Sequence, residues 1–233
     1  MDLRRLSRYV AMLAALLAAS IIYMNRKDSS KKFIGRSDIK IEDGRLTPEL
    51  LWSIGRVGDF SVSPDGTRIA YQVTYPSVEE NRSHTVIYVM NEDGSGLRLL
   101  TRTAESESSP AWIDNNRIAF LSPHKGIQQV FCMNADGSHR RQLSFADRDV
   151  EGFRFSPDAQ HVVMIMGVPN PLVRKQQYED LPKATGMIAD DLMFRHWDTW
   201  VTSLPHPFLA AFDGKRISDR TRDLLEGEPF ESP

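Results

Sequence analysis

The feature that most constrains the fold of this chain is a hexapeptide that occurs twice. Met-Asn-Glu-Asp-Gly-Ser occupies residues 90–95, and Met-Asn-Ala-Asp-Gly-Ser occupies residues 133–138, 43 positions later. Runs of β-branched and aromatic residues precede both copies. Asp-Gly between such runs is a strong hairpin signal, because the tight turn requires positive φ angles. Each hexapeptide therefore predicts a turn between two antiparallel strands.

A second pair of repeats lies upstream of these turns, at residues 60–71 and 110–120. In both, an apolar run is broken by Pro-Asp-Gly or Asp-Asn-Asn and resumes as Arg-Ile-Ala-aromatic. One repeat thus contains four strands and two hairpins. Four strands repeating every roughly 43 to 50 residues are typical of a β-propeller blade, which buries its faces against neighbouring blades.

A third copy begins at residues 153–166, but its second hairpin follows only at 206–217. The turn aspartates Asp93, Asp136 and Asp213 are separated by 43 and then 77 residues. The third blade therefore carries an insertion of about 34 residues, at about 169–202. We predict an all-β fold: an incomplete β-propeller over 58–233, with about three four-stranded antiparallel blades at about 58–101, 109–144 and 152–225.

Composition is that of a soluble globular protein, with 41% hydrophobic residues, 26% charged residues and a net charge of −2. The absence of a basic stripe argues against nucleic acid as a partner. The single cysteine, Cys132, excludes an internal disulfide and is expected to be a small core residue. The six histidines are scattered and lack the spacing of metal ligands, so no metal site is predicted. The sequence also lacks a phosphate-binding glycine loop, so no cofactor is predicted.

The N-terminus, residues 1–24, differs from the rest. Three arginines at positions 4, 5 and 8 precede an uncharged run of 17 residues, 9–25, which is followed by Arg26 and Lys27. This pattern predicts a signal peptide, or an uncleaved signal anchor helix that attaches the chain to a membrane. We therefore expect export to the periplasm or the cell surface. A buried N-terminal helix is the alternative, and it leaves the flanking arginines unexplained.

Between this leader and the repeats, residues 25–46 predict a polar linker and residues 47–57 a short helix. Thr47 is the expected N-cap, with Pro48 at the first helical position. The apolar residues of this helix are three to four positions apart and could cover a blade edge.

Three blades are too few to close a ring, since propellers typically have four to eight. The expectation is that the chain is a fragment of a longer protein, or that another chain completes the ring. An uncovered blade face and sheet edge would favour self-association.

Several segments resemble secreted bacterial peptidases of the prolyl oligopeptidase family, especially the dipeptidyl and acylaminoacyl peptidases. They are the stretch LTPELLWSIGRVGDFSVSPDGTRIAY from residue 46, Asn-Arg-Ser at 81–83, and MFRHWDTW at 193–200. The resemblance covers about residues 46–233. It implies a propeller that caps an α/β-hydrolase domain, whose serine lies in a Gly-x-Ser-x-Gly elbow. This sequence contains no such motif, and Ser95 belongs to a hairpin turn. No catalytic residue is assigned, and the chain alone is predicted to be inactive.

The resemblance also implies a propeller that restricts access and shapes the substrate pocket. Peptidases that remove dipeptides need an anion for the substrate α-amino group, and Glu79-Glu80 is the only adjacent glutamate pair. The alternative is an ordinary solvated loop. Because adjacent glutamates repel each other, a shared pocket would need a cation such as Arg82 or a substrate amine.

The insertion supplies the second candidate site, in which Arg195, His196 and Trp197 follow one another. Aromatic residues next to an arginine suit a recognition surface. The alternative is a structural plug with Trp197 and Trp200 buried and Arg195 paired with Asp198. The acidic pair at 190–191 could face a substrate amine, or could be exposed charge at a helix start.

These observations predict the substrate-gating propeller portion of an exported serine exopeptidase that acts on peptides. One alternative is a TolB-like periplasmic propeller that serves as a non-enzymatic protein-binding scaffold. Another is a degenerate gene product that folds poorly. The coding sequence downstream of residue 233 would separate the first two.

Overall fold

The computed structural model describes residues 32–38, 41, 44–170, 173–174, 188–189, 195–196 and 199–227. The predicted leader 1–24 and much of the insertion lie outside these residues. In the part of the chain that is described, no helix is long and apolar enough to cross a bilayer.

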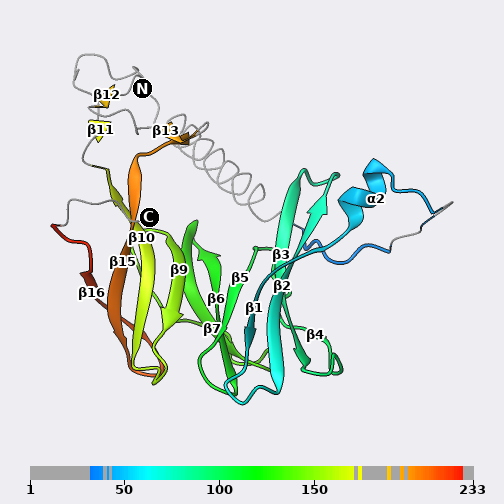
Figure 1. Cartoon of the computed structure of the whole chain (residues 1–233), viewed down its shortest axis with the longest axis horizontal. Coiled ribbons are helices and arrows are strands. Elements are labelled where there is room, and N and C mark those ends of the chain that lie inside the picture. The colour runs from blue at the N-terminus through cyan, green and yellow to red at the C-terminus, as the bar shows by residue number, and fades with distance from the viewer. Residues whose placement is uncertain are drawn as a thin grey trace, which may run out of the picture.

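Three four-stranded antiparallel sheets follow one another along the chain and lie side by side (Figure 1). We call them blades 1, 2 and 3. Blade 1 contains β1 (Arg56–Val62), β2 (Arg68–Ser77), β3 (Arg82–Asn91) and β4 (Arg98–Leu99). Blade 2 contains β5 (Ser108–Trp112), β6 (Arg117–His124), β7 (Ile127–Asn134) and β8 (Arg141–Gln142). Blade 3 contains β9 (Val150–Phe155), β10 (His161–Pro169), β15 (Ser203–Phe212) and β16 (Ile217–Asp223).

The predicted hairpins are confirmed. The hexapeptide at 90–95 turns between β3 and β4, and its counterpart at 133–138 turns between β7 and β8. Gly94 and Gly137 have φ angles of 82° and 86°, which explains the glycine at both positions. The insertion separates β10 from β15 and contains two short hairpins. They are formed by β11 (Val173–Arg174) with β12 (Ile188–Ala189), and by β13 (Arg195–His196) with β14 (Thr199–Trp200).

The core lies between the blades. One cluster joins blades 1 and 2, with Ala70 and Ile87 against Phe120 and Phe131. Another joins blades 2 and 3 and includes Cys132, which is buried as predicted, so burial raises the pKa of its thiol. Each blade therefore buries side chains on the face that meets its neighbour.

The helix before blade 1 is shorter than the predicted 47–57. Helix α2 covers Pro48–Ser53, and β1 already begins at Arg56. Thr47 is the N-cap, since its hydroxyl accepts a hydrogen bond from the Leu50 amide at 3.2 Å. None of the helix residues is buried, so α2 does not bury its apolar side chains against a blade edge. The chain adopts an extended conformation at Ile54, which ends the helix early.

Residues 32–38 lie within the predicted polar linker, yet they pack against blade 1. Ile34 contacts a small cluster formed by Val73, Tyr75 and Val86 on the face of blade 1 that points away from blade 2. We call residues 32–38 the strap.

Candidate functional site

The glutamate pair lies at the end of a hairpin in blade 1. Glu79 and Glu80 belong to the turn at 78–81 that joins β2 to β3. The turn is closed by the Asn81 amide, which donates to the Val78 carbonyl at 3.2 Å, and by the Glu80 amide, which donates to the Ser77 hydroxyl at 3.1 Å. Glu79 is exposed, whereas the side chain of Glu80 is only 23% exposed. The two carboxylates therefore have different surroundings.

Glu80 binds a primary amine from its own chain. The Lys32 ammonium lies 3.2 Å from the Glu80 Oε1 atom, and this hydrogen bond raises the pKa of Lys32. The sequence suggested Arg82 or a substrate as the cation, but Arg82 instead donates to the Lys32 carbonyl. The carboxylate of Glu80 is thus occupied by the strap.

A buried histidine fixes the strap next to this turn. His84 lies on β3 and is fully buried. Its Nδ1 atom is 2.7 Å from the Ile34 carbonyl and 3.2 Å from the Ile34 amide, while its Nε2 atom is 3.0 Å from the Glu105 carbonyl. The Phe33 ring meets the imidazole edge to face at 5.0 Å. The strap is therefore held through the Ile34 backbone and the Phe33 ring.

A cavity of about 410 Å³ lies beside the same turn. Trp52 of α2 forms one wall and is 47% exposed, and the Arg56 guanidinium lies 5.4 Å from the centre of its ring. The other lining residues come from the β2–β3 hairpin: Pro76, Ser77, Val78, Asn81, Arg82 and Ser83. Sequence analysis did not single out Trp52 as a site residue, because its exposure follows only from the structure. The lining offers apolar surface and one cation, Arg82, whereas Glu79 and Glu80 lie in the adjoining turn and not in the wall of the cavity.

A larger groove of about 820 Å³ follows the first strand of each blade. Its lining comes from β1, β5 and β9 and the turns after them. Asp59 and Arg154 contribute charges of opposite sign, while Phe60, Trp112 and Phe153 contribute aromatic surface. This groove is large enough for a short peptide segment.

The second predicted site lies on a different blade. Arg195 and His196 form β13, in which they pair with Trp200 and Thr199. Trp197, Asp198 and residues 190–191 lie outside the described residues. Both the insertion and the glutamate turn connect the second strand of a blade to the third. Blade 2 lies between blade 1, which carries the glutamate turn, and blade 3, which carries the insertion (Figure 1).

Two other features bear on chemistry. Ser95 lies in the β3–β4 turn, where its amide donates to Asp93 Oδ1 at 2.9 Å. It is a turn residue, as predicted. Among the described residues, no group of three histidine, cysteine or acidic side chains is arranged to hold a metal ion.

Comparison with known proteins identifies relatives among peptidases. The chain is 44% identical over 190 residues to dipeptidyl-peptidase 5 of Porphyromonas gingivalis, and 37% identical over 193 residues to dipeptidyl-peptidase 5 of Porphyromonas endodontalis. These alignments cover 81% and 82% of this chain, but only 28% of each relative. The chain thus spans little more than a quarter of the length of these proteins. No family model matches the sequence.

Solved structures share the fold at lower sequence identity. An acylaminoacyl peptidase from Pyrococcus horikoshii superposes with a TM-score of 0.53 at 15% identity, covering 74% of this chain and 25% of that one. An acylaminoacyl peptidase in complex with Z-Gly-Gly-Phe-chloromethyl ketone gives a TM-score of 0.54 at 14% identity, covering 74% of this chain and 26% of that one. At this identity the likeness concerns the fold alone.

Proposed function

We propose that this chain is the substrate-recognition and access-restricting propeller portion of an exported serine exopeptidase of the prolyl oligopeptidase family. The observation that carries the proposal is the 44% identity over 190 residues to a dipeptidyl-peptidase. The three blades and the two acylaminoacyl peptidases with the same fold agree with it.

In this proposal the peptide bond is cleaved by a hydrolase domain outside the present 233 residues. A serine of that domain attacks the peptide carbonyl, the amine of the following residue leaves, and water then releases the peptide acyl group from the serine. The propeller portion takes no part in bond cleavage. It selects peptides by their amino terminus and by their size.

The role proposed for Glu79 and Glu80 is to bind the α-amino group of the substrate. The ion pair between Glu80 and Lys32 supports it, because the carboxylate already holds a primary amine at 3.2 Å. A substrate amine must then displace Lys32, and the cavity beside Trp52 would receive an apolar side chain of the peptide. The insertion with Arg195, His196 and Trp197 is proposed to contact the substrate farther from its amino terminus.

Binding to the full chain tests this role. The probes are alanyl-alanyl-phenylalanine amide and its N-acetylated form, titrated by calorimetry. We expect the free amine to bind more tightly than the acetylated peptide, Glu80→Gln to abolish this preference, and Lys32→Ala to strengthen binding of the free amine. Glu92→Gln, an exposed glutamate in another turn, is the matched control and should change nothing. Equal binding of both peptides would show that Glu79 and Glu80 are ordinary charged residues of a surface loop and do not bind the substrate amine.

The proposed hydrolase domain has a separate test. Sequencing the DNA downstream of the Pro233 codon should reveal an open frame with further strand repeats and a Gly-x-Ser-x-Gly motif. A frame that ends after further blades would instead indicate a binding scaffold. The proposed export is tested by fusing residues 1–46 to a reporter that is active only outside the cytoplasm.

A further inference from the structure

An ion pair fills the space between blades 1 and 2. Arg140 lies just before β8 and donates to Glu107 Oε1 at 2.8 Å and to the Ser122 hydroxyl at 2.9 Å. Its guanidinium lies 4.3 Å from the centre of the Phe131 ring and 5.7 Å from that of Phe120. The buried carboxylate of Glu107 balances its charge. A planar group of the chain itself therefore covers the aromatic floor of this junction.

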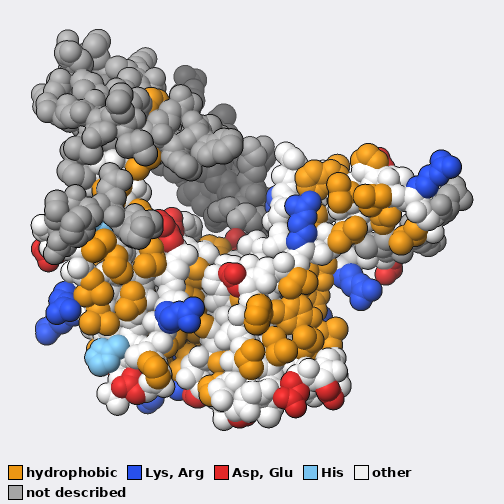
Figure 2. Space-filling view, viewed as in Figure 1, with side chains coloured by type: hydrophobic (Ala, Val, Ile, Leu, Met, Phe, Trp, Pro, Cys, Tyr) orange, Lys and Arg blue, Asp and Glu red, His pale blue; other side chains and the backbone are white. Residues whose placement is uncertain are grey.

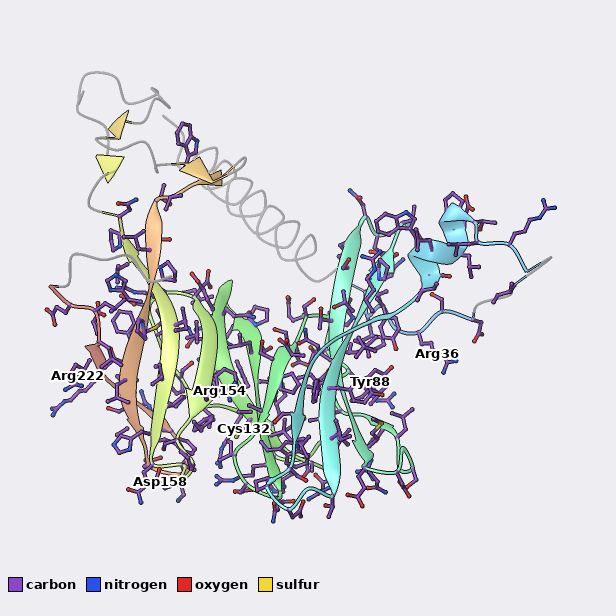
Figure 3. The ribbon with its side chains drawn as sticks, viewed as in Figure 1. Arg36, Tyr88, Cys132, Arg154, Asp158 and Arg222 are labelled. Atoms are coloured by element: carbon purple, nitrogen blue, oxygen red, sulfur yellow. The ribbon has the colours of Figure 1, made fainter. Side chains whose placement is uncertain are left out.

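Blade 3 has the same strand positions with different side chains. The strand registers give the equivalent residues of blades 2 and 3: Phe120 and Met164, Phe131 and Phe208, Ser122 and Met166, Glu107 and Val150, Arg140 and Thr221. Figure 3 shows Arg222 at the outer edge of blade 3, extending away from blade 2. Thr221 precedes it in β16, so its side chain lies on the opposite face, toward blade 2. Blade 3 thus keeps a ring in the floor of its junction with blade 2 and lacks both members of the ion pair.

A cavity of about 350 Å³ lies at this place, between blade 3 and the segment 143–149 that follows β8. We call it the junction cavity. Its lining includes Thr221 and the side chains of two phenylalanines and two methionines: Phe145, Phe208, Met164 and Met166. Blades 2 and 3 and the segment between them all belong to the described residues. Its volume lies at the lower end of the range for small-molecule sites.

One of these aromatic side chains is held in an exposed position. Phe145 is 50% exposed, and the Arg216 guanidinium lies 4.4 Å from the centre of its ring. Arg216 in turn donates to Asp219 Oδ2 at 2.6 Å. The arginine and its carboxylate partner therefore hold an aromatic ring at the cavity, where a ligand can contact it.

The charged residues of the lining are already paired. Asp147 Oδ1 accepts from Arg148 Nε at 2.9 Å, and Asp219 binds Arg216. The position of Glu107 has no carboxylate in blade 3, so a cation on the cavity floor would lack a buried partner. On the face of the molecule shown in Figure 2, basic and acidic side chains are dispersed and form no field of one sign. An uncharged ring fits this cavity better, because aromatic faces and thioethers both make favourable contacts with it.

We propose that the junction cavity binds a small, uncharged aromatic molecule, whose ring takes the position that the Arg140 guanidinium has between blades 1 and 2. The ring contacts Phe208 and the thioethers of Met164 and Met166, and Phe145 contacts it from the rim. A donor on the ring has the two carboxylates of the lining as acceptors. The cavity is separate from the glutamate turn of blade 1, and the inference does not rest on the proposed peptidase function.

Calorimetric titration of the full chain with indole tests the site. We expect saturable binding to the wild-type chain. Thr221→Arg places a guanidinium over the floor as in blade 2, so it should fill the cavity and weaken indole binding at least about tenfold. Gln160→Arg adds the same charge at an exposed position of the β9–β10 turn, outside the cavity, and should bind indole as the wild type does.

A second variant and a second probe keep the test decisive. Thermal unfolding shows whether Thr221→Arg remains folded; Phe145→Ala removes only an exposed side chain and should weaken indole binding about threefold. N-methylguanidinium, a planar cation, should bind far more weakly than indole. The absence of indole binding, indole binding that neither variant weakens, or tighter binding of N-methylguanidinium would each overturn the inference.

Discussion

At the scale of single residues, the turn aspartates explain why the repeat is so visible in the sequence. Asp65 Oδ1 accepts hydrogen bonds from the Ser63 hydroxyl at 2.6 Å and from the Thr67 hydroxyl and amide at 2.8 and 3.1 Å. These bonds, led by that from Ser63, lower the pKa of Asp65 to about 2. Equivalent bonds lower the pKa of Asp93 and Asp136. Each aspartate is therefore a stabilising acceptor while it is ionised.

The first prediction concerns the pH dependence of this acceptor. Because the pKa of Asp65 is lower in the folded than in the unfolded chain, its stabilisation is fully present above about pH 4 and is lost as the pH falls toward 2. Asp65→Asn should lower the urea midpoint at pH 7, and the difference from wild type should shrink below pH 4. Asp59→Asn, at an exposed site, is the control. A difference that is constant between pH 7 and pH 2.5 would contradict this role.

A buried ion pair gives the second residue-scale prediction. Glu107 is 1% exposed, and its Oε1 atom accepts from Arg140 Nη2 at 2.8 Å. The Arg140 guanidinium also lies 4.3 Å from the centre of the Phe131 ring. Arg140→Met leaves the carboxylate buried without its cation and should cost about 2–4 kcal/mol in the free energy of unfolding. The double variant Glu107→Gln/Arg140→Met should lower the free energy of unfolding by less than Arg140→Met alone. An equal loss in the two variants would contradict a penalty from the unpaired Glu107 carboxylate.

At the scale of elements, the strap shows what local sequence patterns cannot predict. The repeats predicted the three sheets and the insertion because turn chemistry and alternation are local. The structure places the glutamate pair in the turn between β2 and β3. Its partner Lys32 was missed, because it lies 48 positions earlier in a stretch whose polarity resembles that of a linker. The end of α2 was misjudged because Ile54 continues the apolar spacing of Leu50 and Leu51, whereas the backbone is already extended at Ile54.

The third prediction tests the strap as an element. Ile34 is partly buried on Val73, Tyr75 and Val86, and its backbone meets His84. Ile34→Asp should release the strap, because a charge on this apolar cluster is costly. Hydrogen exchange at β2 and β3 should then increase around Tyr75 and Val86, while β6 and β7 keep their protection. Arg45→Asp, at an exposed position after the strap, is the control. Unchanged exchange in β2 and β3 would show that the strap does not protect blade 1.

At the scale of the whole molecule, the proposed function assigns recognition to the blades and catalysis to a domain outside these residues. The described serines lie in strands, turns and loops, and the sequence contains no Gly-x-Ser-x-Gly elbow. Peptide hydrolysis by a serine enzyme requires an activated nucleophile and donors for the developing oxyanion. Under the proposed function, the 233 residues should release no product from a dipeptidyl chromogenic substrate, even at high protein concentration. A full-length dipeptidyl-peptidase serves as the positive control. Activity that co-purifies with the chain through successive chromatography steps would require a catalytic centre within these 233 residues. The proposal that a separate hydrolase domain cleaves the peptide would then be wrong.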